Sequence, residues 1–140
     1  MGVMDFPDKV AIVVRDDLEA WQRINVAAFV MSGVAATAGD DSVGPPYVDA
    51  DGVAYLPMLR QPVLVFEAGA EKLKTVHRRA LERDATMAIY TRQLFSTGHD
   101  DENRAAVRAV ATADLDLVGL AVRAPHRAAD QIVRGLRRHP

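Results

Sequence analysis

Residues 90–104, YTRQLFSTGHDDENR, combine hydroxyl side chains, a glycine, a histidine and three acids. His99 is the most useful of these for chemistry, because an imidazole exchanges protons near neutral pH. Ser96 lies close by, but no G-x-S-x-G turn surrounds it and no partner acid is identifiable, which argues against a serine hydrolase. A second, purely local interpretation is that Thr97 and Asp100 cap the helix that follows.

The elements around this stretch alternate between strands and helices. Nearly continuous apolar runs predict strands at residues 9–14, 62–68, 86–91 and 115–122, and helical spacing predicts helices at residues 20–38, 71–84, 100–110 and 125–139. This order predicts one α/β domain over residues 1–140, a three-layer α/β/α sandwich with a mainly parallel sheet. Asp51 and Gly52 predict a small β-hairpin after the first helix.

That first helix is apolar almost all round from Ile24 to Ala38, so we expect it to be covered on more than one side. Polar side chains interrupt it at Gln22, Asn25 and Ser32, on one stripe. Together with Trp21, the stripe is expected either to line a pocket or to face solvent at a gap between layers.

In α/β sheets, ligands bind beyond the carboxyl ends of the parallel strands. That edge is expected to collect residues 15–17, Glu67 and residues 91–99, so the stretch around His99 also has a positional argument for function. Arg60 precedes a core strand, where a guanidinium can hold a carboxylate or phosphate; the alternative is an ion pair with an acid of the hairpin. The candidate ligand-binding residues are Arg15, Trp21, Asn25, Arg60, Thr91 and Thr97, and the candidate catalytic residues are His99 and Asp17.

Composition narrows the classes of function. The chain has no cysteine, and its four histidines lack the spacing of a metal site, so we expect no bound metal and no cofactor. A net charge of -2 gives no general attraction to nucleic acid. The sequence contains no apolar run long enough to span a membrane, and an acid stands where a secretory signal carries basic residues. We therefore expect a cytoplasmic protein that does not associate with membranes.

Four strings are recognisable together: VVRDDL.AWQ.INV.AF..SG, YLPMLRQPVLVF, YT..LF.TGHD..NR.AV and DLVGLA. Over essentially the whole chain they resemble the bacterial family called domain of unknown function 2000 (DUF2000). That family is grouped by structure with the type 2 peptidyl-tRNA hydrolases. The resemblance implies a four-stranded mixed sheet in the order 2-1-4-3, with the last strand antiparallel to the others.

The hydrolases look like VVR.DL.MGKGK.AAQ.SHA after their first strand. Here Arg15, Asp17 and Leu18 agree with that pattern, but the lysine that the enzymes need corresponds to Asn25, and their histidine to Ser32. Their DAG.T motif after the third strand is also replaced. Because these departures affect the residues that the hydrolases need for their reaction, the resemblance does not imply peptidyl-tRNA hydrolysis.

Two functional hypotheses follow. The first is a protein that binds a small anionic or nucleotide-like ligand; if it is a hydrolase or transferase, His99 acts as acid or base, Arg15 or Arg60 anchors an anion, and Asn25 orients the ligand. The second is a non-enzymatic RNA-binding or interaction domain that uses an arginine-rich C-terminal helix. Its arginines are Arg127, Arg134 and Arg138, and Arg123 stands just before it. A homodimer through the apolar first helix or the hairpin is a further hypothesis.

Overall fold

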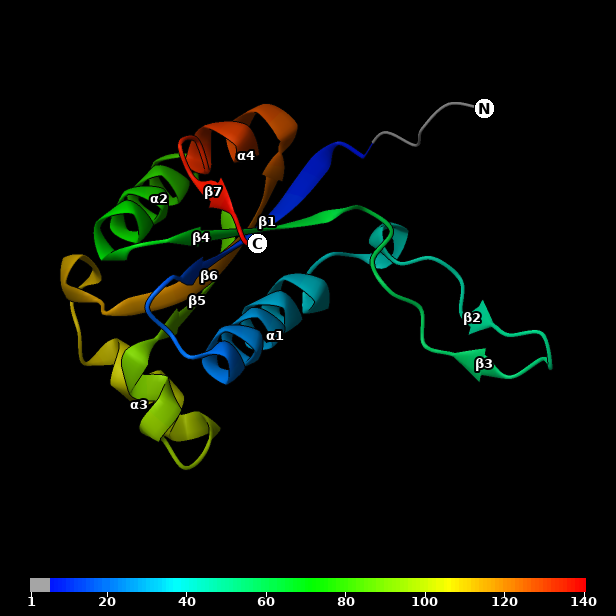
Figure 1. Cartoon of the computed structure of the whole chain (residues 1–140), viewed down its shortest axis with the longest axis horizontal. Helices are drawn as coiled ribbons and strands as arrows, with labels where there is room; N and C mark the ends of the chain where they lie inside the picture. The colour runs from blue at the N-terminus through cyan, green and yellow to red at the C-terminus, as the bar shows by residue number, and fades with distance from the viewer. Residues whose placement is uncertain (1–5) are drawn as a thin grey trace.

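The computed structural model describes residues 6–140, in which a mixed sheet lies between two layers of helices (Figure 1). The strands are β1 (Asp8–Arg15), β2 (Tyr47–Val48), β3 (Ala54–Tyr55), β4 (Val63–Ala68), β5 (Thr86–Thr91), β6 (Leu117–Pro125) and β7 (Arg137–Arg138). The α-helices are α1 (Ala20–Ala36), α2 (Ala70–Glu82), α3 (Asp100–Arg108) and α4 (His126–Ile132). One five-stranded sheet has the order β5-β6-β1-β4-β7, and β2 pairs only with β3.

The three layers follow from the alternation of side chains along the central strand β1. Val10, Ile12 and Val14 point to one face and pack against α1, in a cluster that also holds Val26. Ala11 and Val13 point to the other face, toward the cluster that includes side chains of α2 and α4. Because both faces of β1 are covered, its near-continuous apolar sequence is explained. The predicted three-layer sandwich is confirmed.

The direction of the strands differs from the expectation based on alternation alone. Only the β1–β4 pair is parallel, whereas β6 runs antiparallel to both β1 and β5, and β7 runs antiparallel to β4. A mainly parallel sheet was therefore the wrong expectation. The order implied by the family resemblance, with the last long strand antiparallel, is the one that the four long strands adopt. The two-residue β7 makes it a five-stranded rather than a four-stranded sheet.

The C-terminal segment accounts for that extra strand. The predicted helix over residues 125–139 ends at Ile132, and the chain turns through Gly135, which has a φ of 87°. Arg137 and Arg138 then pair with β4, so the four arginines do not share a helical stripe. The guanidinium of Arg138 lies 5.8 Å from the centroid of the Phe66 ring. The helical periodicity of the sequence did not reveal this turn, because the arginines that follow it are as compatible with a helix as with a strand.

The first helix is covered on one side only. Val26, Val30 and Val34 are buried against the sheet, but Ile24 is 71% exposed and Phe29 is 57% exposed. The expectation that α1 is covered on more than one side is therefore wrong for the single chain.

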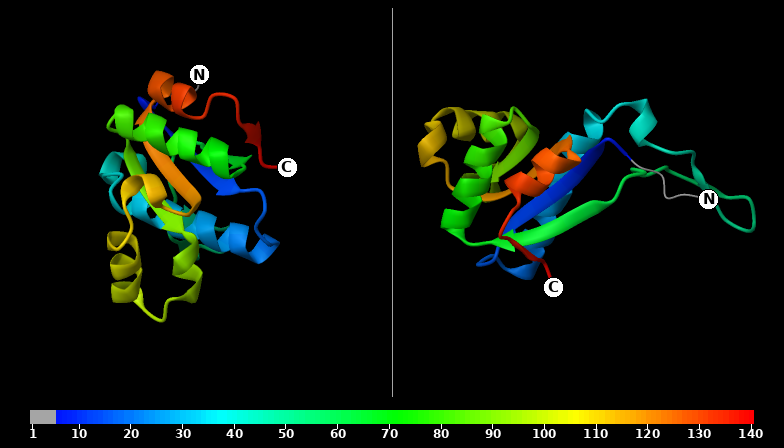
Figure 2. Two further views of the ribbon diagram at one scale, coloured as in Figure 1. Left: turned by 90° about the vertical axis from the view of Figure 1, so that its left-hand side faces the viewer. Right: turned by 90° about the horizontal axis from the view of Figure 1, so that it is seen from above.

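The hairpin is confirmed and forms an arm that projects from the body of the molecule (Figures 1 and 2). Asp49 holds its turn: one carboxylate oxygen accepts hydrogen bonds from the backbone N–H groups of Asp51 and Val53, both at 3.0 Å, and the other accepts the hydroxyl of Tyr55 at 2.7 Å. These bonds, the Tyr55 hydroxyl foremost, lower the pKa of Asp49. The polar residues of the hairpin thus serve the turn itself.

The buried histidine His77 on α2 predicts how the stability of the protein depends on pH. Burial lowers the pKa of this histidine from its ordinary value of 6.5, so the unfolded chain binds the proton more readily than the folded one. Stability is therefore fully present above pH 6.5 and falls as the pH drops toward the folded pKa. Urea unfolding between pH 7.5 and 5.5 is expected to show this loss, and His77→Gln is expected to flatten the slope. Equal slopes in the two proteins would contradict it.

Within residues 6–140, no helix combines the length and apolar character needed to cross a membrane.

Candidate functional site

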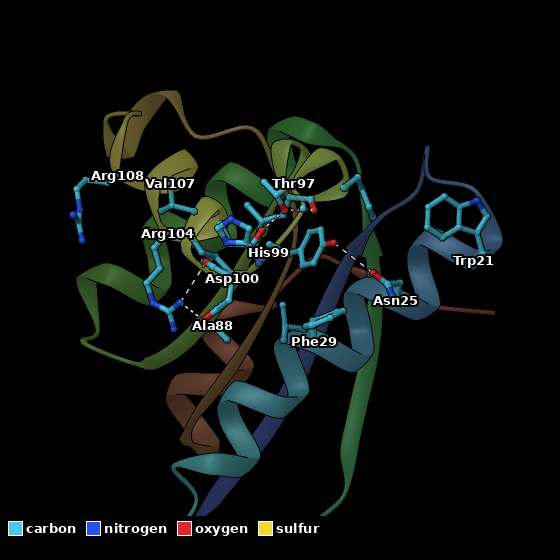
Figure 3. A pocket seen from close by; sticks show the side chains of 17 residues that line it. Trp21, Asn25, Phe29, Ala88, Thr97, His99, Asp100, Arg104, Val107 and Arg108 are labelled. Carbon is cyan, nitrogen blue, oxygen red and sulfur yellow. Dashed lines mark hydrogen bonds and ion pairs between the residues drawn. The ribbon is translucent and has the colours of Figure 1, made fainter.

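The candidate site is an open groove of about 940 Å³ on the α1 side of the edge strand β5 (Figure 3). Helix α1 forms one wall through Trp21, Asn25 and Phe29. Residues 97–100 and α3 form the other wall, and β5 contributes Ala88 to Tyr90. The site therefore lies where the stretch from Tyr90 to Arg104 turns away from the sheet, as its position in the chain predicts.

Four aromatic rings form a continuous chain along the groove. The ring of Trp21 meets that of Phe95 edge-on at 5.9 Å between centroids, Phe95 lies 5.0 Å from Tyr90, and Tyr90 lies 6.0 Å from Phe29. Tyr90 is buried, whereas Trp21 and Phe29 are each 57% exposed. The outer rings thus offer flat apolar surfaces to a ligand, and Tyr90 supports them from below.

Tyr90 also connects the rings to the polar residue of α1. Its hydroxyl lies 3.4 Å from Oδ1 of Asn25 and donates a hydrogen bond to it. Burial raises the pKa of Tyr90 further above neutral pH, and the protonated phenol is the hydrogen-bond donor. The bond holds the Asn25 amide at the groove, as Figure 3 shows. The amide nitrogen has no hydrogen bond to any described residue, so this donor is available to a ligand.

The opposite wall begins with a local network around Thr97. Its hydroxyl donates to the carbonyl of Leu94 at 3.1 Å and contacts the side chain of Asn103, while the backbone N–H of Gly98 donates to Glu102 at 2.6 Å. The N-cap residue of α3 is His99, without a side-chain capping bond. The expected Thr97–Asp100 cap is therefore wrong, because Glu102 reaches back from the first turn and takes the backbone N–H instead.

His99 stands at the rim of the groove with 65% of its side chain exposed. Its Nε2 lies 3.4 Å from a carboxylate oxygen of Glu102. Two guanidinium groups follow on α3. Arg104 pairs with Asp100 one turn earlier, and Arg108 forms no ion pair with any described residue. This wall therefore carries an imidazole and two guanidinium groups, all of them accessible from solvent.

Arg15 and Asp17 lie at the tip of β1, in an ion-pair network that does not line this groove. Arg15 donates to both carboxylate oxygens of Asp17, at 3.1 and 2.8 Å, and to the carbonyl of Leu117 at 3.0 Å. The hydrogen bond from Arg15 lowers the pKa of Asp17. Arg92 and Asp116 complete the network. It ties the end of β1 to the start of β6 and to the segment that follows β5.

The remaining predicted residues lie apart from the groove as well. Thr91 is buried, with 2% of its surface exposed. Arg60 lies at the base of the arm, where its backbone N–H donates to the carbonyl of Ser42 at 2.9 Å and its guanidinium lies 5.8 Å from the Phe6 ring. Of the predicted residues, the structure thus brings Trp21, Asn25, Thr97 and His99 together. It does not bring Arg15, Asp17, Arg60 or Thr91 to the same groove.

Sequence analysis did not single out several groove residues, although three of them lie in the stretch 90–104: Phe29, Tyr90, Phe95, Arg104 and Arg108. One signal was present, since Trp21, Asn25 and Phe29 follow each other at intervals of four along a helix, which places them on one stripe. No comparable signal joins α1 to α3, because their contact depends on the path of the chain after β5. Residues 6–140 contain no group of three or more histidine, aspartate or glutamate side chains placed to hold a metal ion.

Comparison with known proteins places this geometry in a family. The family described as protein of unknown function DUF2000 matches residues 8–140. Among seven matching chains of solved structures is the protein of unknown function Atu0240 from Agrobacterium tumefaciens strain C58. It shares 40% sequence identity and superimposes with a TM-score of 0.92, and the match covers 97% of this chain and 100% of that chain. No curated protein matches. The chain thus belongs to the DUF2000 family.

Proposed function

We propose that the protein binds a small nucleotide-like ligand, with a planar apolar part and an anionic group, in the groove between α1 and α3. The observation that carries the proposal is that exposed aromatic rings of α1 and the guanidinium groups of α3 line one groove. The volume of about 940 Å³ falls in the range of sites for small molecules and cofactors.

The aromatic wall suits the planar part of such a ligand. A base or similar ring stacked on an aromatic side chain gains roughly 1–3 kcal/mol. Trp21 is the most suitable platform, because its ring is half exposed and its edge-on contact with Phe95 holds its orientation. Beside it, the free amide donor of Asn25 can bind a ring nitrogen or carbonyl oxygen. This assigns Asn25 the orienting role.

The α3 wall suits the anionic part. Arginine binds phosphate and carboxylate oxygens through paired, charge-assisted hydrogen bonds. Arg108 needs to break no existing ion pair, and Arg104 can exchange its exposed pair with Asp100 for the ligand at little cost. We therefore assign the anion-binding role to Arg104 and Arg108 instead of Arg15 or Arg60, the residues that the sequence suggested.

If the protein is an enzyme, His99 is the residue that we propose for its acid–base chemistry. It is the imidazole on the groove, and its Nε2 lies 3.4 Å from a carboxylate oxygen of its neighbour Glu102. In a hydrolase or transferase, His99 would serve as acid or base, while Asp17 would act only structurally, through its ion pairs with Arg15 and Arg92. Peptidyl-tRNA hydrolysis is not proposed, because Asn25 cannot supply the charge of the lysine it replaces.

Calorimetric titration with adenosine monophosphate, adenosine and ribose 5-phosphate tests the binding. We expect the nucleotide to bind more tightly than either half, and Trp21→Ala and Arg108→Ala each to weaken it about tenfold, which corresponds to ~1.4 kcal/mol. Arg127→Ala is the matched control, because Arg127 is an exposed arginine on α4, which covers the other face of the sheet. Absence of nucleotide binding, or equal affinities in all four proteins, would rule out the proposal.

A further inference from the structure

Large apolar side chains are exposed at two places on the described chain. The first is the outer side of α1, with Trp21, Ile24 and Phe29. The second is the arm, which we define as residues 47–58 and which exposes Tyr47, Val48, Val53, Tyr55, Leu56 and Met58. The one other exposed large apolar side chain found in residues 6–140 is Leu81 on α2. Such a concentration is typical of interaction surfaces rather than of scattered surface residues.

The outer side of α1 is unusual for a helix that faces water. From Ile24 to Ala36 the helix carries no charged residue, although only Val26, Val30 and Val34 are buried. Helices at a protein surface ordinarily carry charged or polar residues on the side away from the core. This side therefore has the composition of a helix that is covered by another layer.

The arm is unusual for a different reason: it is regular in structure, yet its large apolar side chains are exposed. Its two strands have two residues each, and a two-stranded hairpin alone is marginally stable in water. Asp49 holds its turn, and the bridge between Val43 and Leu59 closes its base. Beyond that base it extends away from the sheet and the helices (Figures 1 and 2). Leu56 is 86% exposed there. Among residues 6–140, the arm thus presents an apolar surface to solvent.

We propose that the chain forms a two-fold dimer in which the arm of each copy lies on the outer side of α1 of the other copy. A second copy is the partner that explains both surfaces at once, since a two-fold axis that places one arm on one helix necessarily places the other arm on the other helix. The arm cannot do this within its own chain, because it leaves the C-terminal end of α1 and points away from it.

The exposed area is sufficient for such a dimer. Nine large apolar side chains of α1 and the arm are between 50% and 86% exposed. Since a large aromatic side chain has roughly 150–250 Å² to bury, the two surfaces together offer on the order of 1,000 Å² per copy. A stable interface of standard size needs about 800 Å² from each partner. The inference does not depend on the groove binding any ligand, although Trp21 and Phe29 belong to both surfaces.

Sedimentation velocity of the full chain over a dilution series tests the dimer. We expect the unmodified chain to be dimeric, and Ile24→Glu and Leu56→Glu each to raise the dissociation constant roughly 30-fold or more, the effect of losing a residue central to an interface. Leu81→Glu is the matched control, because Leu81 is an equally apolar, 50% exposed side chain that lies outside both surfaces. Circular dichroism checks that each variant keeps its fold. A monomeric unmodified chain, or a dimer that neither variant weakens, would overturn the proposal.

Engineered disulfides distinguish exchange of arms from other dimers. Because the chain has no cysteine, Ile24→Cys and Leu56→Cys introduce single thiols without interference. Oxidation of a mixture of the two variants is expected to give mainly the mixed disulfide, while each variant alone gives little. Crosslinking of the Ile24→Cys variant with itself, without the mixed product, would show helix-to-helix pairing and overturn the exchange of arms.

Discussion

Gly119→Ala is expected to lower the free energy of unfolding by about 1–3 kcal/mol, the usual cost of an overfilled core. Gly119 lies in β6 beneath α1, and a Cβ atom there would stand 2.3 Å from Cγ1 of Val26 and 3.2 Å from the carbonyl oxygen of Val13. The first distance is far inside van der Waals contact, so the helix must move away from the sheet or the valine must change rotamer. Urea unfolding followed by circular dichroism measures the loss.

A double variant tests the stated cause. Val26→Ala removes the atom that the new methyl group meets, so Gly119→Ala combined with Val26→Ala is expected to lose less stability than the two single losses together. Gly44→Ala serves as control, because a Cβ atom there meets only the side chain of Arg60, at 3.4 Å. It should change stability by less than about 0.5 kcal/mol. Strict additivity of the two core substitutions would contradict the packing argument.

Arg23→Ala is expected to cost about 2–4 kcal/mol, because this guanidinium contacts two backbone carbonyls and the buried carboxylate of Glu67 at once. It donates to the carbonyls of Asp16 and Leu18, the latter at 3.0 Å, and lies 3.8 Å from the carboxylate of Glu67. The Glu67 side chain is only 6% exposed. Removing Arg23 leaves that charge with Arg137 alone and frees the turn between β1 and α1.

Two further variants separate charge from geometry at this position. Arg23→Lys keeps a positive charge near Glu67 but cannot bond in several directions, so its loss of stability is expected to be intermediate. Arg78→Ala removes an exposed arginine paired with Glu82 at 3.4 Å on α2, and should change stability by less than about 1 kcal/mol. Denaturant unfolding at neutral pH measures all three. A loss in Arg23→Ala no larger than in Arg78→Ala would show that the network contributes little.

Taken together, the site and the two stability predictions concern the same contact, that of α1 with the sheet. Gly119 allows the helix to approach β6 closely, Arg23 holds its first turn, and Tyr90 binds Asn25 midway along it. The wall of the proposed ligand site is therefore positioned by the core. A variant of any of these residues has to be checked for fold before a change in binding is interpreted.

The elements of this protein were predictable from the sequence alone wherever local pattern decides structure. The strand over residues 86–91 has the predicted bounds, and the β1 and α2 regions agree to within two residues, because apolar periodicity and β-branched runs act over a few neighbouring positions. The hairpin at Gly52 was predictable for the same reason, since a φ of 85° at its turn favours glycine. Residues on one element, such as Trp21 and Asn25, could be assigned to one site by spacing.

Tertiary structure alone decided which distant residues meet. Arg15 and His99 both follow strands that end at the same edge, yet Arg15 turns into the network with Asp17 and Asp116, while His99 lies at the start of α3, on the groove. Arg137 and Arg138 leave the predicted helix and pair with the edge of β4, opposite Glu67 and Phe66. The physical reason is common to both cases: ion pairs and strand pairings between residues far apart in the chain depend on the packed positions of whole elements, which no local pattern of side chains encodes.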